Sequence, residues 1–206
     1  MKIFVLHYSK LVDRKRFIMD QFEKQNITDY EFIEQHNKEE LVNKHLFKEL
    51  SDSKISLIMK HFHVYRQAIH HDISLIFEDD VILADNFNET LQKYMSQLPK
   101  DFDMLFIGDG CNLHIPSVPN KNIYEKGLYP TKWGGNGASR CSDSYIISNK
   151  CALKLCSYIS KMTSMKLPID WWINEAARDM KLKVYWAEPT IVTQGSLNGF
   201  FESSLN

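Results

Sequence analysis

Three consecutive acidic residues give the strongest chemical signal in the sequence. Glu78, Asp79 and Asp80 follow directly after the hydrophobic run 73–77. Carboxylates this close repel one another unless a cation neutralises them, and Mg²⁺ and Mn²⁺ prefer carboxylate oxygens while keeping positions open for phosphate. Because side chains alternate along an extended chain, Glu78 and Asp80 lie on one side, and we predict that this pair holds a divalent metal ion. The alternative is an acidic turn in contact with solvent.

A second group of residues suited to sugar chemistry is Asp170, Trp171 and Trp172. Indole rings offer large apolar faces on which a sugar ring can stack. A carboxylate beside such a platform can take the proton of an attacking hydroxyl group. Asp170 is therefore the candidate catalytic base, and Trp171 is a candidate sugar contact. The structural alternative is a helix N-cap at Asp170 followed by two core tryptophans.

The stretch 111–139 is predicted to be one long loop. It contains Trp133 and the cluster 134–137, which reads Gly-Gly-Asn-Gly, and Arg140 follows it. Irregular segments of this length in a compact domain are usually functional or mobile, and glycines allow an aromatic side chain to close over a ligand. We therefore expect Trp133 and Arg140 to contact the sugar or the acceptor. An exposed connection is the alternative.

Several well-known catalytic motifs are missing from the sequence. The P-loop pattern Gly-x-x-x-x-Gly-Lys-Ser/Thr is absent, as is Gly-x-Gly-x-x-Gly after the first strand, which disfavours nucleotide triphosphate hydrolysis and dinucleotide binding. His61 and His63 fall on a predicted helix two positions apart, where side chains do not face each other, so they do not indicate a zinc site.

The elements that must position these residues alternate between buried strands and amphipathic helices. Apolar runs predict strands at 3–6, 30–33, 73–77, 104–107, 145–147, 184–186 and 190–193. Apolar residues at helical spacing predict helices that start at 13, 54, 87, 150 and 170. This order is typical of an α/β nucleotide-binding fold, in which ligands bind at the carboxyl ends of the strands. The acidic triplet falls at such an end.

Composition predicts one globular domain over residues 1–206. Hydrophobic residues make up 44% and charged residues 25%, and 25 Lys+Arg against 26 Asp+Glu give a net charge of −1. This balance disfavours a nucleic-acid partner, because such binding depends on a basic surface. No run approaches the roughly 20 apolar residues of a membrane span, and the N-terminus lacks a signal-peptide pattern. We expect a cytoplasmic protein without a membrane span; a homodimer is compatible with this composition.

Taken together, these motifs resemble glycosyltransferase family 25, which includes bacterial lipooligosaccharide β-galactosyltransferases and procollagen β-galactosyltransferases. The similar blocks follow the order of the family along the chain, at 3–14, 76–81, 102–108, 144–152, 167–170 and 189–194. The first block contains Ser9, Asp13 and Arg14. Two departures are clear: only His61 remains of the family's Gly-Cys-x-x-Ser-His, and His7 replaces a small polar residue.

The resemblance implies a GT-A type, Rossmann-like α/β fold that binds a nucleotide sugar, with a mostly parallel central sheet flanked by helices. It implies an inverting, metal-dependent transfer of a hexose, galactose or glucose, from a UDP-sugar to a hydroxyl of a glycan, a glycosylated protein or a hydroxylysine-type acceptor. Such activity would belong to lipooligosaccharide biosynthesis or collagen glycosylation, and viral or bacterial origin fits it.

The resemblance also implies roles for particular residues. The triplet would act as a DXD-like motif in which Glu78 and Asp80 bind Mn²⁺ or Mg²⁺. The expected nucleotide-sugar contacts are His7, Ser9, Arg14 and Asp79, and Gln194 is an expected sugar or acceptor contact.

Two other classes of function remain open from the sequence. The first is a metal-dependent nucleotidyltransferase or phosphodiesterase, in which Asp109 and Asp143 would help to bind a second metal ion. The second is a catalytically inactive sugar-binding domain. The products separate them, because a glycosyltransferase releases UDP, the first rival releases a nucleotide monophosphate, and the second releases neither.

Overall fold

The computed structural model describes residues 1–42, 44–116, 118–127 and 138–203. Its centre is a seven-stranded sheet in the order β2-β1-β3-β7-β5-β8-β6. The strands are β1 (Lys2–Leu6), β2 (Tyr30–Ile33), β3 (Ile73–Glu78), β5 (Met104–Phe106), β6 (Ile123–Glu125), β7 (Ser144–Ser148) and β8 (Val184–Ala187). Five strands run in one direction, and β7 and β6 run in the other. The predicted α/β class with a mostly parallel sheet is confirmed.

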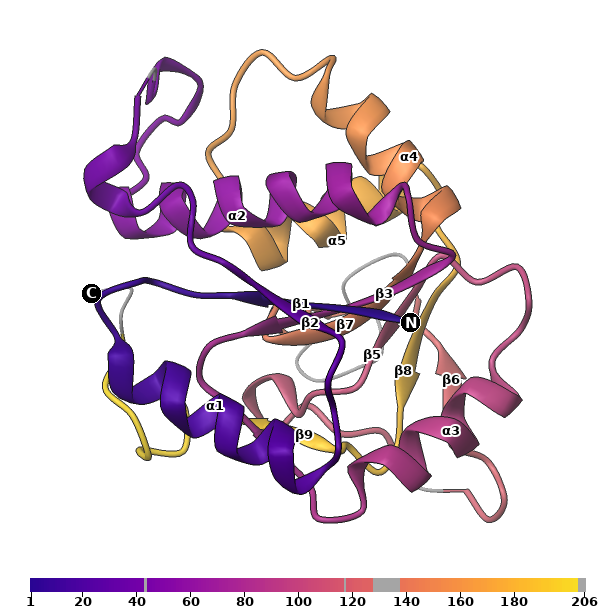
Figure 1. Ribbon diagram of the computed structural model, residues 1–206. Coiled ribbons are helices and arrows are strands. Elements are labelled where there is room, and N and C mark those ends of the chain that lie inside the picture. The colour runs from indigo at the N-terminus through magenta and orange to yellow at the C-terminus, as the bar shows by residue number, and fades with distance from the viewer. Residues whose placement is uncertain (43, 117, 128–137, 204–206) are drawn as a thin grey trace.

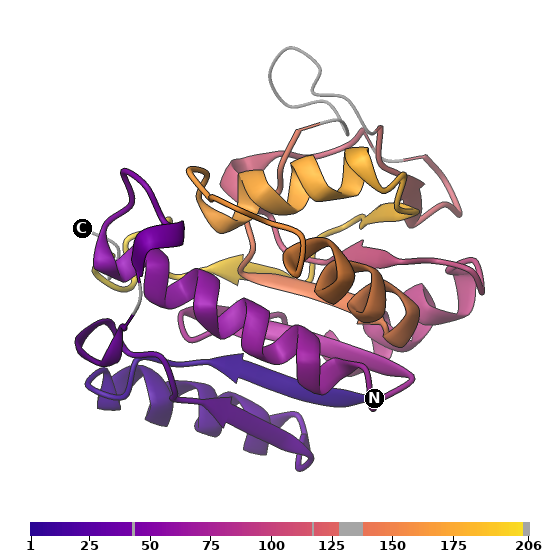
Figure 2. The same ribbon diagram turned by 90° about the horizontal axis from the view of Figure 1, so that it is seen from above.

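Helices cover both faces of this sheet (Figure 1). The helices are α1 (Val12–Lys24), α2 (Asp52–Ala68), α3 (Phe87–Gln97), α4 (Asn149–Ile159) and α5 (Ile169–Asp179), with short 3-10 turns at Lys38–Glu40, Lys44–Leu46 and Gly110–Asn112. Helices α2, α4 and α5 lie on one face, where Figure 2 shows them side by side, and α1 and α3 lie on the other. None of the helices that the structure describes is long and apolar enough to cross a lipid bilayer.

The alternation of side chains along β3 shows why its apolar run is continuous. Ile76 packs into the core under α2, α4 and α5, whereas Leu75 and Phe77 pack into the core under α1 and α3. All three are fully buried. A strand covered on both faces needs mostly apolar residues, and four of the five residues from 73 to 77 are apolar, Ser74 being the buried exception.

A small antiparallel pair of strands extends from the acidic triplet. It consists of β4 (Val81–Leu83) and β9 (Val192–Gln194), with Val81 opposite Gln194. The backbone N–H of Gly195 donates to the backbone oxygen of Asp80 at 2.7 Å. This pairing carries the C-terminal segment 195–203 to the triplet, although it is far away in sequence.

Two local expectations were wrong. The stretch expected to be loop from 111 to 139 contains β6, which pairs with β8 in antiparallel register and is too short to show a periodic pattern. Helix α5 has Pro168, not Asp170, at its N-cap, because the helix begins at Ile169. Asp170 instead lies in the first turn, as the second residue of the helix.

Candidate active site

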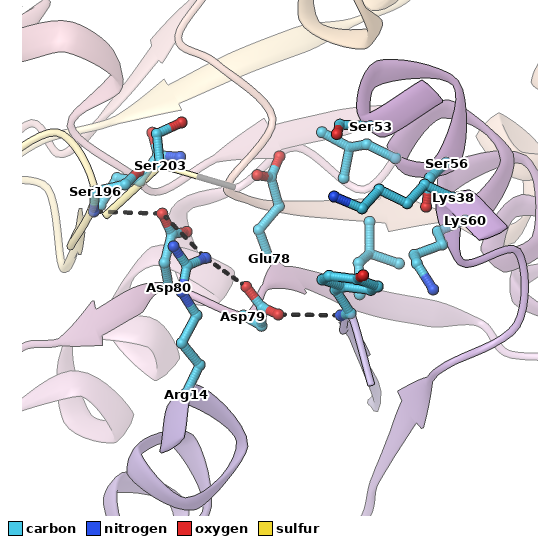
Figure 3. Close-up of a pocket in the computed structure, with 14 residues that line it drawn as sticks. Arg14, Lys38, Ser53, Ser56, Lys60, Glu78, Asp79, Asp80, Ser196 and Ser203 are labelled. Atoms are coloured by element: carbon cyan, nitrogen blue, oxygen red, sulfur yellow. Dashed lines mark hydrogen bonds and ion pairs between the residues drawn. The ribbon is translucent and has the colours of Figure 1, made fainter. Parts of the chain in front are cut away.

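The acidic triplet lies at the carboxyl end of β3 and lines a cavity there (Figure 3). Glu78 is the last residue of β3, and Asp79 and Asp80 form the turn into β4. The cavity is lined by residues from the ends of β1 and β3, from α1 and α2, from the 38–40 turn and from the segment after β9: Leu6, Tyr8, Arg14, Lys38, Ser53, Ser56, Leu57, Lys60, Glu78, Asp79, Asp80, Gln194, Ser196 and Ser203. The predicted location of a ligand at this edge of the sheet therefore coincides with a cavity.

Asp79 connects β3 to β1 and α1. Leu6 of β1 is in register with Glu78 of β3, so the residues that follow them, His7 and Asp79, lie next to each other. Asp79 Oδ2 lies 2.8 Å from His7 Nδ1 and accepts the backbone N–H of Tyr8 at 3.1 Å, while Asp79 Oδ1 accepts a 2.8 Å hydrogen bond from Arg14 Nη1. Both oxygens of Asp79 thus have protein partners, and His7, Arg14 and Asp79 form one buried group.

Asp80 has a carboxylate oxygen without a partner. Its Oδ2 accepts the backbone N–H of Ser196 at 3.3 Å and lies 3.9 Å from Arg14 Nη1. Its Oδ1 is buried and has no hydrogen-bond partner among the described residues. Burial raises the pKa of Asp80 above its ordinary value. An unpaired buried carboxylate oxygen is costly, so a cation is a suitable partner for it.

Glu78 points into the middle of the same cavity. Its Oε1 accepts a 2.7 Å hydrogen bond from Ser142 Oγ. Burial, followed by the neighbouring charge of Asp80, raises the pKa of Glu78 to about 8. Within the described part of the chain, no group of three or more His, Cys, Asp or Glu residues is arranged as a metal site. Two carboxylates nevertheless fit Mg²⁺ or Mn²⁺, which are commonly held by one or two carboxylates together with water and phosphate.

Asp170 lies close enough to influence this acidic pair. It lines a second hollow together with Glu78, Gln194 and Ser196, all three of which also line the first cavity. Burial raises the pKa of Asp170, and backbone hydrogen bonds in the first turn of α5 partly offset that effect. The candidate base, the acidic pair and Gln194 therefore lie around connected hollows.

The two tryptophans after Asp170 have different environments. Trp172 is 4% exposed and packs against Phe62 and Tyr158, with ring centroids 5.0 and 5.9 Å away. Trp171 is 48% exposed. Only Trp171 is thus free to contact a sugar, and Trp172 is a core residue.

Arg140 does not offer a free guanidinium group. It is 1% exposed and donates to the backbone oxygens of Leu113 and Ala187 at 2.8 and 2.9 Å, and also to Glu188. Its guanidinium lies 4.4 Å from the ring centroid of Trp186. These contacts hold Arg140 in the protein interior, where it lines a small hollow together with Asp170. The sugar or acceptor contact expected of Arg140 stays a prediction. Trp133, the other residue expected to contact ligand from this region, lies outside the described residues.

Ser9 lies outside the cavity lining and is exposed. Its Oγ accepts a 2.9 Å hydrogen bond from Asn37 Nδ2, and Asn37 Oδ1 in turn accepts one from Lys60 Nζ at 3.2 Å. Ser9 thus reaches the cavity only through these two residues.

Lys60 is a cavity residue that the sequence analysis missed. It is 3% exposed, and its ammonium group donates to the backbone oxygens of Gln35 and Ile33 at 2.6 and 3.3 Å. Burial lowers the pKa of Lys60 to about 8. A signal was present, because Ser56 and Lys60 are polar, one turn apart, and interrupt the buried face of an amphipathic helix.

A sequence model of one protein family matches most of the chain. The family is described as Glycosyltransferase family 25 (LPS biosynthesis protein), and the match covers residues 1–173. The chain belongs to glycosyltransferase family 25. The matched range includes the acidic triplet and ends within α5, shortly after Asp170. This match confirms the resemblance drawn from the order of the sequence blocks.

Two known proteins are similar to this family 25 chain. A protein of Acanthamoeba polyphaga mimivirus, R655, named as a candidate glycosyltransferase, is 32% identical over 138 residues, which cover 61% of this chain and 42% of the relative. The aligned region is thus less than half the length of that relative. The crystal structure of a glycosyltransferase involved in the glycosylation of the major capsid of PBCV-1 aligns with a TM-score of 0.53 and 8% identity, over 94% of this chain and 93% of that chain. This likeness shows the fold, which is of the predicted GT-A type.

Proposed function

We propose that this family 25 chain is an inverting, metal-dependent hexosyltransferase that uses a UDP-sugar and an acceptor hydroxyl on a glycan or a hydroxylysine-type residue. The observation that supports this most strongly is the arrangement of Glu78, Asp80 and Asp170 around connected hollows at the carboxyl edge of the sheet. Two acids there suit a metal, and a third is placed to act as a base.

Glu78 and Asp80 would hold Mn²⁺ or Mg²⁺. When bound, the ion supplies positive charge that stabilises the leaving diphosphate. The protein fixes the two carboxylates from behind: Ser142 binds Glu78, and the N–H of Ser196 binds Asp80. Asp79 contributes indirectly, because it anchors Arg14 beside Asp80.

The wall opposite the triplet would bind the nucleotide. Figure 3 shows Lys38 and Lys60 across the cavity from Asp80. The ammonium group of Lys60 donates to neutral oxygens of Ile33, Gln35 and Asn37, so no carboxylate of a described residue is hydrogen-bonded to it. A nucleoside diphosphate has the opposite charge. His7 and Ser9 would then support this wall and the triplet from outside, through Asp79 and Asn37.

Asp170 would remove the proton from the acceptor hydroxyl. In one displacement, the acceptor oxygen forms a bond to C1 of the hexose, the bond from C1 to the diphosphate oxygen breaks, and the hydroxyl proton passes to Asp170. A raised pKa makes Asp170 a stronger base than an ordinary aspartate once it is ionised. Gln194, which lines both hollows, and the exposed Trp171 are the proposed sugar and acceptor contacts.

Product analysis tests this function. Purified chain is incubated with UDP-galactose or UDP-glucose and Mn²⁺, with and without a galactoside or hydroxylysine peptide, and the nucleotides are separated by anion exchange. UDP as the nucleotide product, together with a glycosylated acceptor, is the expected result. UMP would indicate the nucleotidyltransferase or phosphodiesterase class instead. Binding of UDP-sugar without turnover would indicate an inactive sugar-binding domain.

A further inference from the structure

A chain of three buried polar side chains ends beneath Glu78. His61 Nδ1 lies 2.7 Å from the hydroxyl oxygen of Tyr145, which lies 2.9 Å from the hydroxyl oxygen of Tyr65. All three side chains are fully buried. At the other end of the chain, His61 Nε2 lies 3.8 Å from Glu78 Oε1 and has no hydrogen-bond partner among the described residues.

The hydrogens available to His61, Tyr145 and Tyr65 decide which nitrogen of the His61 ring is protonated. His61 is fully buried and has no ion-pair partner at hydrogen-bond distance among the described residues, so the ring is neutral and carries one N–H. If Nδ1 carries it, that N–H donates to Tyr145, Tyr145 donates to Tyr65, and the hydrogen of Tyr65 has no acceptor. If Nε2 carries it, Tyr65 donates to Tyr145, Tyr145 donates to Nδ1, and the ring N–H faces Glu78. In the second arrangement the remaining hydrogen, on Nε2, lies on the side of Glu78 Oε1, an acceptor 3.8 Å away, whereas in the first the remaining hydrogen of Tyr65 has no acceptor among the described residues. An unused buried donor is costly, so the second arrangement is favoured.

Two side chains lie near the same carboxylate oxygen of Glu78, Oε1. Ser142 Oγ donates to Oε1 and His61 Nε2 lies 3.8 Å from Oε1, whereas Oε2 accepts no hydrogen bond from a described residue. A hydrogen bond between Nε2 and Oε1 would need the two atoms to approach to the usual distance of about 2.9 Å. One oxygen is thus held by the protein, and the other is left for the cavity.

We propose that His61 is a positioning residue for Glu78: Tyr65 and Tyr145 fix the Nε2–H tautomer, and that N–H, with the hydroxyl of Ser142, holds Oε1 so that Oε2 is presented to the cavity. The proposal rests on the metal-binding role given to Glu78 under the proposed function. The competing explanation is packing alone, because the rings of His61 and Tyr145 are stacked at 5.8 Å.

Two substitutions of His61 separate these explanations. In His61→Gln the amide nitrogen can occupy the place of Nε2, and in His61→Asn it can occupy that of Nδ1. We expect His61→Asn to weaken Mn²⁺ affinity by about 10–100-fold, the usual cost of losing a group that orients a metal ligand, and His61→Gln to weaken it much less. Calorimetric titration of the full chain with Mn²⁺ measures this, alongside the free energy of unfolding. Equal losses in the two variants, or no loss in either, would overturn the proposal.

Nuclear magnetic resonance of the metal-free chain tests the same geometry without the metal. With ¹⁵N-labelled histidine, we expect His61 to show the Nε2–H pattern in the wild type and in Tyr65→Phe, and to lose it in Tyr145→Phe. The ¹³C signal of the Glu78 carboxyl should shift in His61→Asn and stay in His61→Gln. An Nδ1–H pattern in the wild type contradicts the proposal whether or not Mn²⁺ binds. The expected signals without Mn²⁺ binding would support the positioning of Glu78 while rejecting its metal role in the proposed function.

Discussion

Arg14 Nη1 donates a 2.8 Å hydrogen bond to Asp79 Oδ1, and both side chains are more than nine-tenths buried. This bond divides the acidic triplet into two parts. Asp79 is bound within the protein, while Glu78 and Asp80 keep an oxygen without a protein partner in the described residues. The division follows from the partners within reach, because His7, the N–H of Tyr8 and Arg14 all lie at hydrogen-bond distance from Asp79.

Asp79→Asn should therefore affect folding before it affects ligand binding. Removal of one partner of a buried ion pair costs about 3–5 kcal/mol, and Arg14 would keep only the more distant Asp80, 3.9 Å away. Urea denaturation followed by circular dichroism measures the loss in the free energy of unfolding. If stability is unchanged while nucleotide affinity is lost, Asp79 contacts the donor directly, as the sequence first suggested.

Asp80→Asn should have the opposite effect. The amide keeps the size of the side chain but cannot serve as an anionic metal ligand, so Mn²⁺-dependent UDP binding and turnover should disappear. Stability should not fall, because burial already disfavours the ionised form of Asp80. The matched control is Asp85→Asn, which removes an exposed acid from the same segment. Mn²⁺-dependent binding that survives in Asp80→Asn would remove Asp80 from the metal site.

The raised pKa of Glu78 predicts how stability depends on pH in the absence of metal. The pKa of Glu78 rises from 4.5 to about 8 on folding. Between these values the folded state holds a proton that the unfolded state has lost, so the free energy of unfolding falls as pH rises. Glu78→Gln removes this contribution. The variant should be more stable than the wild type at pH 8, and the difference should vanish below pH 4.5.

Urea denaturation of both proteins at several pH values checks this prediction. Buried Asp80 and Asp143 also have a raised pKa, so part of the wild-type slope should remain in the variant. Identical slopes in the two proteins would mean that Glu78 ionises in its ordinary range.

Asp170→Asn should slow transfer without weakening donor binding. Loss of a general base typically costs about 10²–10⁴-fold in rate. In the wild type, kcat should rise with pH as Asp170 ionises, and this limb should lie above the ordinary pKa of 3.8 because burial raises the pKa of Asp170. Steady-state kinetics across pH and UDP titration measure both effects. Asp179→Asn, at the exposed far end of α5, is the control. Unchanged kcat in Asp170→Asn would mean that Asp170 is not the base and has only a structural role in the first turn of α5.

Gly195→Ala should disturb the site through the C-terminal segment. A Cβ atom at this position would lie 2.8 Å from the backbone oxygen of Asp80 and 2.7 Å from the ring of Phe201, so the segment must shift. We expect a loss of about 1–3 kcal/mol in stability, as for other overpacked sites, together with weaker Mn²⁺-dependent UDP binding. Asn198→Ala changes an exposed residue of the same segment and should leave binding unchanged. Equal UDP affinity in the two variants would mean that the C-terminal segment does not contribute to UDP binding.

Much of the fold follows from local patterns in the sequence. Continuous apolar runs located β1, β3 and β5, and three- and four-residue spacing located α2, because these periods depend only on neighbouring residues. Strand β6 was not predicted, because three residues are too few to show an alternation of apolar and polar side chains. The start of α5 was misplaced because Pro168 and Asp170 both suit a helix N-terminus, and only the backbone geometry distinguishes them.

The site was predictable in its acids and not in their partners. Glu78 and Asp80 could be predicted as site residues because they follow directly after a buried strand. The pairing of Asp79 with Arg14 joins residues 65 positions apart, and Ser142 reaches Glu78 across 64 positions. Such contacts depend on sheet order, which residue spacing does not contain. Arg140 illustrates the same limit, because its burial against Glu188 and Trp186 comes from tertiary packing.

The most direct test of the central claim is UDP release from a UDP-hexose by the wild type and by Asp80→Asn, measured with Mn²⁺ and again after addition of EDTA. We expect the wild type to release UDP from one UDP-hexose only while metal is present, and Asp80→Asn, although folded, to release none. UDP release that continues in EDTA, or that is equal in the two proteins, would contradict the claim that Glu78 and Asp80 hold a metal ion for glycosyl transfer.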